Sequence, residues 1–424
     1  MLKKLGFLTA ISSVLMLSTN IPIQDLIPVV TQDTANAVYD EQEVVIEKKS
    51  LSNPPITNVG IDNTKNLAEI EVLNTKINYS SSAKSAIMLD AKTGRVLYEK
   101  NANQQLPMAS TTKIVTAITV IDNCENLDEV VKIDSKAVGV EGTSIYLRTG
   151  EQLTVRELLY GLMLRSGNDA ATALALHTGG TLENFCKMMD EKAKECGAEN
   201  SSFKNPHGLD AKGHYTTAKD LALITSYALS NKDFAKIVST KSVTIGEGES
   251  KRLLLNKNKL LSKLDGCIGV KTGFTDDAGR CLVSACERDN LKLVSVVFNC
   301  GPMFEESQEL LELGFENFSM CEILPPYQSM DNVPVENGVK EYVGTYSQKG
   351  LSLPLSKQEE SNINIVIDLK PMVTAPVEKD QEIGKVEVYA GKHLIFSEKI
   401  YTMEAVDSKL IKDKVKDILD NWNA

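Results

Sequence analysis

Residues 107–121 read PMASTTKIVTAITVI, and this stretch decides how the whole chain is interpreted. The apolar run from Ile114 to Ile121 is too long for an ordinary strand and predicts a buried helix that begins just after Pro107. Ser110 lies at the start of this helix, and Lys113 follows three residues later on the same face. The spacing therefore predicts a lysine amine about one helical turn from a serine hydroxyl.

Two later stretches carry matching chemistry. Ser166-Gly167-Asn168 connects two helix-like segments, and its glycine predicts a tight turn. Lys271-Thr272-Gly273 precedes a hairpin that spans residues 281–299, which predicts a strand whose last glycine leaves room for a substrate backbone. A serine nucleophile, two lysines, an asparagine and such a strand are the components of a serine acyl-transfer site.

The same short patterns occur elsewhere in the chain, so context has to decide. Ser-x-x-Lys recurs at 81–84 and 201–204, and Lys92-Thr93-Gly94 is a second Lys-Thr-Gly that lies between two alternating apolar runs. That copy predicts a β-hairpin turn. Each residue of the three motifs also has an ordinary structural explanation as a helix cap, a turn residue or an edge charge. Only their joint order, spacing and element type favour a functional site.

A serine hydroxyl needs a base before it can act as a nucleophile at neutral pH. A lysine serves as that base only when burial or a second cation lowers its pKa, and Lys271 is the candidate second cation. Because Ser110 lies at a helix N-terminus, unpaired backbone amides there also favour an oxyanion.

The motifs and their flanking sequences resemble the low-molecular-mass penicillin-binding proteins that act as serine-type D-alanyl-D-alanine carboxypeptidases. The resemblance covers about residues 83–406 and rests on the stretches 109–113, 165–171, 205–209 and 265–279. It implies an α/β (α+β) penicillin-recognising, β-lactamase-like or transpeptidase-like domain. In that domain helices flank an antiparallel sheet, and an all-helical lobe lies between the first and third motifs. A small all-β C-terminal domain is expected to follow.

The resemblance also implies residue roles. Ser110 would be the acylated nucleophile, Lys113 its general base and Ser166 a proton relay. Asn168 would bind the substrate amide, and the substrate with its carboxylate would be bound by Lys271, Thr272 and Gly273. The oxyanion hole would be formed by the backbone amides of Ser110 and Phe274. The implied hydrolase removes the terminal D-alanine from peptidoglycan stem peptides, contributes to cell-wall biosynthesis and cell shape, and is inhibited by β-lactam antibiotics.

The family often carries an arginine just before the phenylalanine that corresponds to Phe304, and this chain has Met303 there. The substrate carboxylate would then be held by Lys271, Thr272 or Arg280. No cofactor or metal is expected, because the four histidines show no metal-ligand spacing; they are His177, His207, His214 and His393. We interpret His207 as a loop-packing residue.

Two alternatives stay open. A class A β-lactamase needs a deacylating glutamate in a Glu-x-x-x-Asn loop, and none of the candidate glutamates Glu183, Glu191, Glu195 and Glu199 is followed by asparagine at that distance. A catalytically silent wall-binding scaffold is disfavoured by the intact motifs, but only an assay decides.

The domain organisation follows from composition. Two lysines and an apolar run at residues 5–17, with a small-x-small site at 35–37, predict a signal peptide over 1–37, and a transmembrane helix is the weaker alternative because polar residues interrupt the run. A flexible spacer is expected over 38–82, the acyl-transfer domain over 83–324, the all-β domain over 325–406 and an amphipathic tail helix over 407–424. The protein should therefore be exported to the extracytoplasmic face of the membrane or to the cell wall.

The net charge bears on the binding partners of the protein, and the cysteine content bears on disulfide formation. The formal charge of −11 makes nucleic acid an unsuitable partner. The eight cysteines form no compact framework, which favours buried free thiols over disulfides, and Cys281 and Cys286 should point to opposite faces of one strand.

The C-terminal tail has one apolar face, but its positive and negative charges nearly cancel. Packing against protein and weak contact with a membrane surface through residues 409–424 both stay open.

Overall fold

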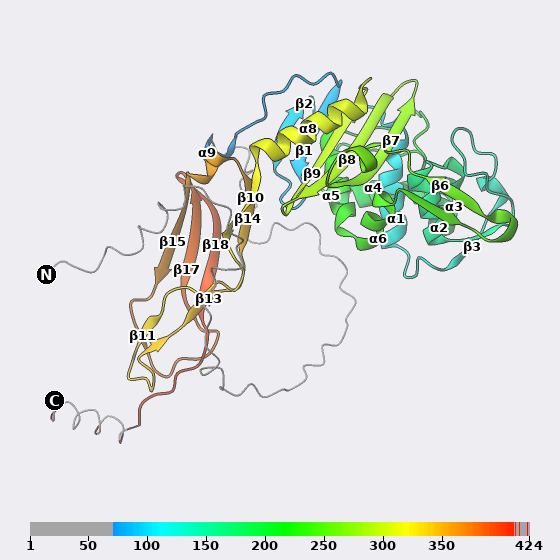
Figure 1. Cartoon of the computed structure of the whole chain (residues 1–424). Coiled ribbons are helices and arrows are strands. Elements are labelled where there is room, and N and C mark those ends of the chain that lie inside the picture. Colours follow the sequence, from blue (N-terminus) through cyan, green and yellow to red (C-terminus); the bar gives the residue numbers. More distant parts are fainter. Residues whose placement is uncertain (1–70, 411, 413–414, 416–421, 423–424) are drawn as a thin grey trace, which may run out of the picture. The chain divides into compact units, whose positions relative to one another are not determined.

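The computed structural model describes residues 71–410 and, beyond them, 412, 415 and 422 (Figure 1). The predicted signal peptide (1–37), most of the predicted spacer (38–82) and most of the predicted tail helix (407–424) therefore lie outside the described residues. Among the helices that the structure describes, none is long and apolar enough to cross a membrane.

The part of the described chain that precedes residue 300 contains a five-stranded antiparallel sheet in the order β2-β1-β9-β8-β7. Its strands are β1 (Ser85–Asp90), β2 (Val96–Lys100), β7 (Cys267–Thr275), β8 (Gly279–Arg288) and β9 (Leu291–Phe298). The turn predicted at Lys92-Thr93-Gly94 is confirmed, since the Asp90 carboxylate accepts the Thr93 amide at 2.8 Å and Gly94 has φ +71°. The predicted hairpin of β8 and β9 is confirmed as well.

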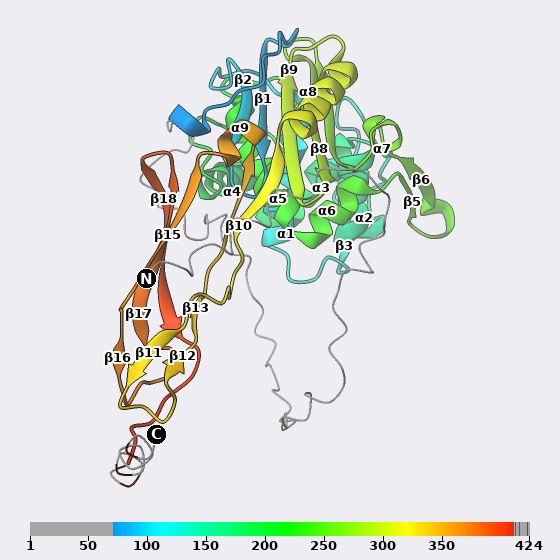
Figure 2. The ribbon, with the colours of Figure 1, turned by 60° about the vertical axis from the view of Figure 1, so that its left-hand side comes forward.

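Both faces of this sheet are covered. Along β1, Ile87 and Leu89 enter the core shared with helices α1 (Lys113–Asp122) and α5 (Ala218–Ser230). Ala86 and Met88 enter the core beneath α8 (Met303–Asn317). This alternation is the two-residue period of a strand, and it explains why every residue of β1 is buried. Figure 2 shows α8 running along β9 and β8 on its side of the sheet.

The region between the first and third motifs is mainly helical. Its helices are α1 (Lys113–Asp122), α2 (Val155–Leu164), α3 (Asn168–Gly179), α4 (Leu182–Glu195), α5 (Ala218–Ser230), α6 (Lys232–Ser239) and α7 (Leu260–Lys263), with short 3₁₀ helices at 109–112, 135–137 and 248–250. Thr154 begins α2 with a capping box in which its side chain and that of Glu157 exchange hydrogen bonds with the backbone.

The expectation of an all-helical lobe was wrong in one respect, because two small hairpins lie within it. β3 (Val130–Lys132) pairs with β4 (Gln152–Thr154), and β5 (Ser242–Ile245) pairs with β6 (Arg252–Leu255). These strands have three or four residues each, too few to give a recognisable periodic pattern.

The predicted all-β C-terminal module is confirmed. Its sheets are β10-β14, β12-β11-β16 and β13-β18-β17-β15. The strands are β10 (Ser319–Leu324), β11 (Val333–Glu336), β12 (Tyr342–Val343), β13 (Thr345–Ser347), β14 (Leu351–Leu355), β15 (Ile363–Leu369), β16 (Val373–Thr374), β17 (Glu382–Ala390) and β18 (His393–Thr402), and the short helix α9 spans Lys357–Glu360. Two apolar clusters, built around Phe396 and Ile383, fill this module.

A buried arginine connects the first hairpin with the segment of β14 and α9. Arg95 forms an ion pair with Glu359 at 2.5 Å, and the two side chains are 2% and 1% exposed. Its guanidinium also donates to the carbonyl oxygens of Leu73, at 2.8 Å, and Pro354, and it lies over the Phe318 ring. All of these partners are far from residue 95 in sequence or lie outside its hairpin, so one side chain holds several segments together.

Replacing Arg95 should destabilise the fold strongly. In Arg95→Met the Glu359 carboxylate stays buried without its cation, and such a loss typically lowers the free energy of unfolding by about 3–5 kcal/mol. The measurement is urea-induced unfolding followed by circular dichroism. The control is Lys399→Met, which removes an exposed partner of Glu382 and should leave the midpoint unchanged. Equal midpoints for the two variants would contradict the role given to Arg95.

Candidate active site

The three predicted motifs meet at the start of α1. Ser110 lies in the 3₁₀ turn that runs into α1, Asn168 is the first residue of α3, and Lys271 lies on β7. Lys113 Nζ is 3.0 Å from Ser110 Oγ and 2.7 Å from Asn168 Oδ1. The structure thus brings Ser110, Lys113 and Asn168 into direct contact from three separate elements.

Lys113 is buried completely, and its surroundings favour a neutral amine. Burial first, and then the charges of Lys271 and Lys257, lower the pKa of Lys113 well below its ordinary value, while Asp169 opposes the shift. Lys113 Nζ donates to Asn168 Oδ1 and, at 2.6 Å, to the His207 carbonyl oxygen. These two acceptors take both hydrogens of a neutral amine, so its lone pair is left for the Ser110 hydroxyl.

A strained turn presents the serine. Ala109, directly before it, has φ +50°, a left-handed conformation that is uncommon for a residue with a side chain. The Ala109 carbonyl oxygen accepts a hydrogen bond from Thr112 Oγ1 at 2.8 Å. Gly208 (φ +89°) lies so close that a Cβ there would be 1.9 Å from the same oxygen. The strained conformation is therefore held from two sides.

His214 supports this turn from behind. Its Nδ1 accepts the Lys204 amide at 2.9 Å, so its other ring nitrogen, Nε2, carries the hydrogen and donates to Thr112 Oγ1 at 3.0 Å. Burial, helped by the charge of Lys204, lowers the pKa of His214 to about 4, so the ring is neutral at pH 7. The result is a chain of hydrogen bonds that ends on the Ala109 carbonyl oxygen.

Ser166 has an unusual backbone. Ser166 itself takes the left-handed conformation, with φ +65°, whereas Gly167 has an ordinary φ of −62°. The expectation that the glycine provides the turn conformation was therefore wrong. Gly167 is needed for space, because a Cβ there would be 2.7 Å from the Asp169 carboxylate. Ser166 Oγ is buried and has no hydrogen-bond partner among the residues that the structure describes.

Strand β7 forms the opposite side of the site. Lys271 is 1% exposed and donates to the carbonyl oxygen of Thr272 at 2.8 Å. Burial, followed by the charge of Lys257, lowers the pKa of Lys271 to about 7. A Cβ at Gly273 would be 3.2 Å from the Ser110 amide nitrogen, so this glycine lets β7 approach the serine turn. The expected room for a substrate backbone beside Gly273 stays a prediction.

The comparisons with known proteins agree with this geometry. A family model described as D-alanyl-D-alanine carboxypeptidase matches residues 72–301, and one described as penicillin-binding protein 5, C-terminal domain, matches residues 318–408. The chain belongs to the D-alanyl-D-alanine carboxypeptidase family. It is 34% identical over 311 residues to D-alanyl-D-alanine carboxypeptidase DacF of Bacillus subtilis, which covers 71% of this chain and 80% of that protein.

Other relatives give the same result. D-alanyl-D-alanine carboxypeptidase DacC of Escherichia coli is 31% identical over 346 residues, covering 77% of this chain and 85% of that protein. Among solved structures, penicillin binding protein 5 from Haemophilus influenzae superposes with a TM-score of 0.63 at 28% identity, covering 78% of this chain and 99% of that chain. The expected penicillin-recognising fold with an all-β C-terminal domain is confirmed.

Sequence reasoning missed Lys257 of this carboxypeptidase. Its charge lowers the pKa of both Lys113 and Lys271, and its backbone amide donates to the Leu164 carbonyl oxygen at 3.2 Å. Burial and the charge of Arg165 lower the pKa of Lys257 as well. Lys257 lies in a loop without a local motif, so no sequence signal identified it. Arg280, considered for the substrate carboxylate, is an exposed residue opposite Phe274.

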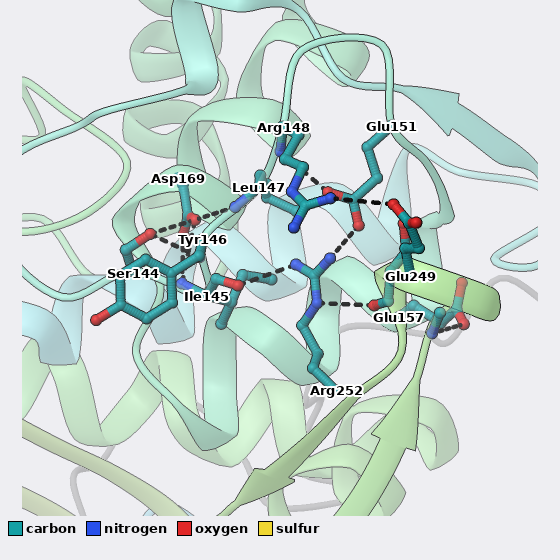
Figure 3. A network of polar contacts seen from close by, with 12 residues as sticks. Ser144, Ile145, Tyr146, Leu147, Arg148, Glu151, Glu157, Asp169, Glu249 and Arg252 are labelled. Carbon is teal, nitrogen blue, oxygen red and sulfur yellow. Dashed lines mark hydrogen bonds and ion pairs between the residues drawn. The ribbon is translucent and has the colours of Figure 1, made fainter.

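Asp169 was also missed, although an acid in the first turn of a helix is a usable signal. Its carboxylate is 1% exposed and accepts hydrogen bonds from Ser144 Oγ at 2.6 Å and from the amides of Ile145 and Leu147 at 3.1 Å (Figure 3). Arg252 donates to the Ile145 carbonyl oxygen at 2.9 Å and pairs with Glu151. The loop over residues 141–151 is thereby fixed beside Asn168, whose Nδ2 donates to the Glu141 carbonyl oxygen at 2.6 Å.

The contact of Gly208 with the serine turn gives a sharp test. Gly208→Ala places a methyl group against the Ala109 carbonyl oxygen, and a displacement of about 1 Å at the nucleophile lowers rates by about 100-fold. The measurement is the second-order rate of acylation by a fluorescent penicillin. Gly94→Ala is the matched control, because Gly94 also has a positive φ (+71°) but nothing lies within 4 Å of its added methyl group. Equal rates in the two variants would contradict the steric argument.

Proposed function

We propose that this carboxypeptidase removes the terminal D-alanine from peptidoglycan stem pentapeptides through an acyl-enzyme on Ser110, and that β-lactams acylate the same serine. The observation that carries the proposal is the contact of a fully buried Lys113 amine with Ser110 Oγ at 3.0 Å, while Asn168 and the His207 carbonyl oxygen accept both hydrogens of the neutral amine. The names of the curated relatives support the same reaction.

In the first step Lys113 takes the proton of Ser110 as the hydroxyl oxygen attacks the carbonyl carbon between the two D-alanines. The tetrahedral oxyanion is bound by the backbone amides of Ser110 and Phe274. The approach of β7 to the serine turn at Gly273 supports this pairing of amides, since it brings the two backbones together.

In the second step the proton passes from Lys113 to the leaving amine of the terminal D-alanine, with Ser166 as the relay. Ser166 supports this role because its hydroxyl is buried and unbonded among the described residues, so it is available to exchange hydrogen bonds with the lysines. Water then attacks the acyl-enzyme, and the same groups return the proton to Ser110.

Substrate binding falls to β7 and Asn168. Lys271 donates one hydrogen to the Thr272 carbonyl oxygen and, when protonated, has two more for the terminal carboxylate of the substrate. The Thr272 hydroxyl also approaches this carboxylate. Lys257 adds positive charge to the same region, since its charge lowers the pKa of Lys271. Asn168 Nδ2 has a second hydrogen for the substrate amide carbonyl.

The two other functions considered have less support. A β-lactamase would have to hydrolyse its acyl-enzyme quickly, and no Glu-x-x-x-Asn segment follows the second motif to activate the water. Burying a lysine is unfavourable, and a scaffold without catalytic activity would gain nothing from the burial of Lys113 against Ser110.

Mass spectrometry tests the proposal directly. Incubation with penicillin should add one acyl group, and peptide mapping should place it on Ser110. Lys113→Ala should lower the acylation rate by at least about 100-fold because the serine proton loses its acceptor. Lys271→Ala should be acylated faster than Lys113→Ala. Its main defect should be weaker binding of ligands that carry the carboxylate. An adduct on Ser166, or unchanged acylation in Lys113→Ala, would overturn the assignment.

The pH dependence should reflect both lysines. The acylation rate of the free enzyme should rise with pH as Lys113 loses its proton, and fall above about pH 7 as Lys271, whose pKa is about 7, loses the charge that attracts the carboxylate. Lys257→Met removes a neighbouring cation, so the falling limb should move up by roughly half a pH unit. Lys259→Met is the control, since Lys259 lies over the Phe304 ring. A falling limb at the same pH in both variants would contradict this role for Lys257.

The protein is also proposed to act outside the cytoplasm, where peptidoglycan lies, after removal of residues 1–37. The stretch of lysines and apolar residues at the N-terminus supports export. Weak attachment to a membrane surface through residues 409–424 is the accompanying proposal, supported by exposed Leu410, Val415 and Trp422 at 59%, 50% and 89%.

Vesicle sedimentation tests the attachment. The protein with and without residues 409–424 is mixed with anionic vesicles at low and moderate salt. Only the complete chain should sediment, and salt should release it, because each lysine contributes only about 1 kcal/mol near such a surface and the nearby aspartates offset part of that. Equal sedimentation of both forms would contradict membrane attachment through residues 409–424.

A further inference from the structure

Two cysteines face each other at the beginning of β7. Cys267 is the first residue of β7, and Cys286 of β8 is its direct partner in the antiparallel register. The neighbouring Glu287 amide donates to the Gly266 carbonyl oxygen at 2.9 Å, which is the bond that flanks a non-hydrogen-bonded pair, and the Cys267 amide donates to the Leu264 carbonyl oxygen at 3.3 Å. Cys267 and Cys286 therefore occupy a non-hydrogen-bonded position of the ladder.

That position has the right dimensions for a crosslink. Opposite Cα atoms in non-hydrogen-bonded pairs lie about 4.5 Å apart, with their side chains closer than in the alternate pairs. Disulfides span Cα separations of about 4.4–6.8 Å, so no backbone movement is required. Both thiols are free in this structure.

We propose that Cys267 and Cys286 are a redox modification site, a thiol pair that forms a reversible disulfide on the strand that carries Lys271, Thr272 and Gly273.

The two thiols differ in access and acidity. Cys286 is fully buried beneath α8, whereas Cys267 is only partly buried, so a reagent in solution reaches Cys267 first. The hydrogen bond from Cys286 lowers the pKa of Cys267, although burial opposes this, and the same hydrogen bond together with burial raises the pKa of Cys286. Cys267 is thus the attacking thiolate, and Cys286 completes the bond.

The oxidant is a low-molecular-mass disulfide. The Cys267 thiolate attacks one of its sulfur atoms, breaks the sulfur–sulfur bond and releases one thiol, which leaves a mixed disulfide on Cys267. Cys286 gives up its proton and attacks Cys267 Sγ, and the second thiol departs. The pair loses two hydrogens in total, and the oxidant is reduced to two thiols.

The crosslink leaves the catalytic part of β7 in place. A bulge between Cys267 and Gly269 separates the pair from the rest of the strand, and from Gly269 to Thr275 the register with β8 continues without interruption. Lys271 and Thr272 lie within this regular part. The disulfide therefore fastens the bulged start of β7 to β8 and protects both sulfurs from further oxidation, while acylation continues.

The experiment uses the reduced full chain, treated with oxidised glutathione, alkylated, digested and mapped by mass spectrometry. Wild-type protein should lose two hydrogens and give one peptide pair linked through Cys267 and Cys286. Cys286→Ser should instead retain glutathione on Cys267, and Cys267→Ser should form neither product. Cys281→Ser is the matched control, because Cys281 is also buried on β8 but faces Gly273, and it should behave as wild type.

Two further readouts test the consequence. Oxidation should raise the melting temperature of wild-type protein by about 5 °C, and dithiothreitol should reverse the rise. The rate of penicillin acylation of the oxidised protein should stay within about twofold of the rate of the reduced protein. The register of β7 with β8 is unchanged, so the activation barrier of acylation is unchanged as well. A wild-type protein that stays reduced, or a linked pair involving other cysteines, would overturn the modification site. If the Cys267–Cys286 disulfide forms but the acylation rate falls tenfold, the claim that the disulfide leaves the catalytic part of β7 undisturbed would be wrong. The proposed function would remain intact.

Discussion

The site depends on one constraint, which is that a lysine buried beside the nucleophile must remain neutral. Lys113 meets it because the groups that touch its amine are an amide oxygen, a backbone carbonyl oxygen and a hydroxyl, none of which is a carboxylate. The nearby acid, Asp169, is engaged by backbone amides and by Ser144. If that carboxylate reached Lys113, the ammonium form would gain a partner and the base would be lost.

The backbone of the site is strained at two residues. Ala109, which directly precedes Ser110, and Ser166 itself both have positive φ, a conformation that costs of the order of 1–3 kcal/mol per residue. Each is held by surroundings that a larger neighbour would disturb, Gly208 for the first and Gly167 for the second. Within the site, backbone strain therefore falls on the residues that aim the hydroxyl groups of Ser110 and Ser166.

Much of this could be predicted from sequence because the strong signals are local. The hairpin at Lys92-Thr93-Gly94, the helix after Ser110 and the strand of Lys271 each follow from a few adjacent residues. The contributions of Lys257 and His214 could not be predicted, since they depend on which loops the fold brings against α1. Gly167 was found but misinterpreted, because the sequence pattern marks a glycine and only the packing reveals whether it provides a turn conformation or space.

Arg95 has a consequence for the order in which the chain folds. Its guanidinium is buried only when Pro354 and Glu359, more than 250 positions later, are in place. Until that segment has been added, the first hairpin carries an arginine that must stay in water, so the hairpin cannot complete its packing early. Contacts between residues so distant in sequence slow folding. A slow last step of this kind fits the proposed export, because an exported chain crosses the membrane before it folds.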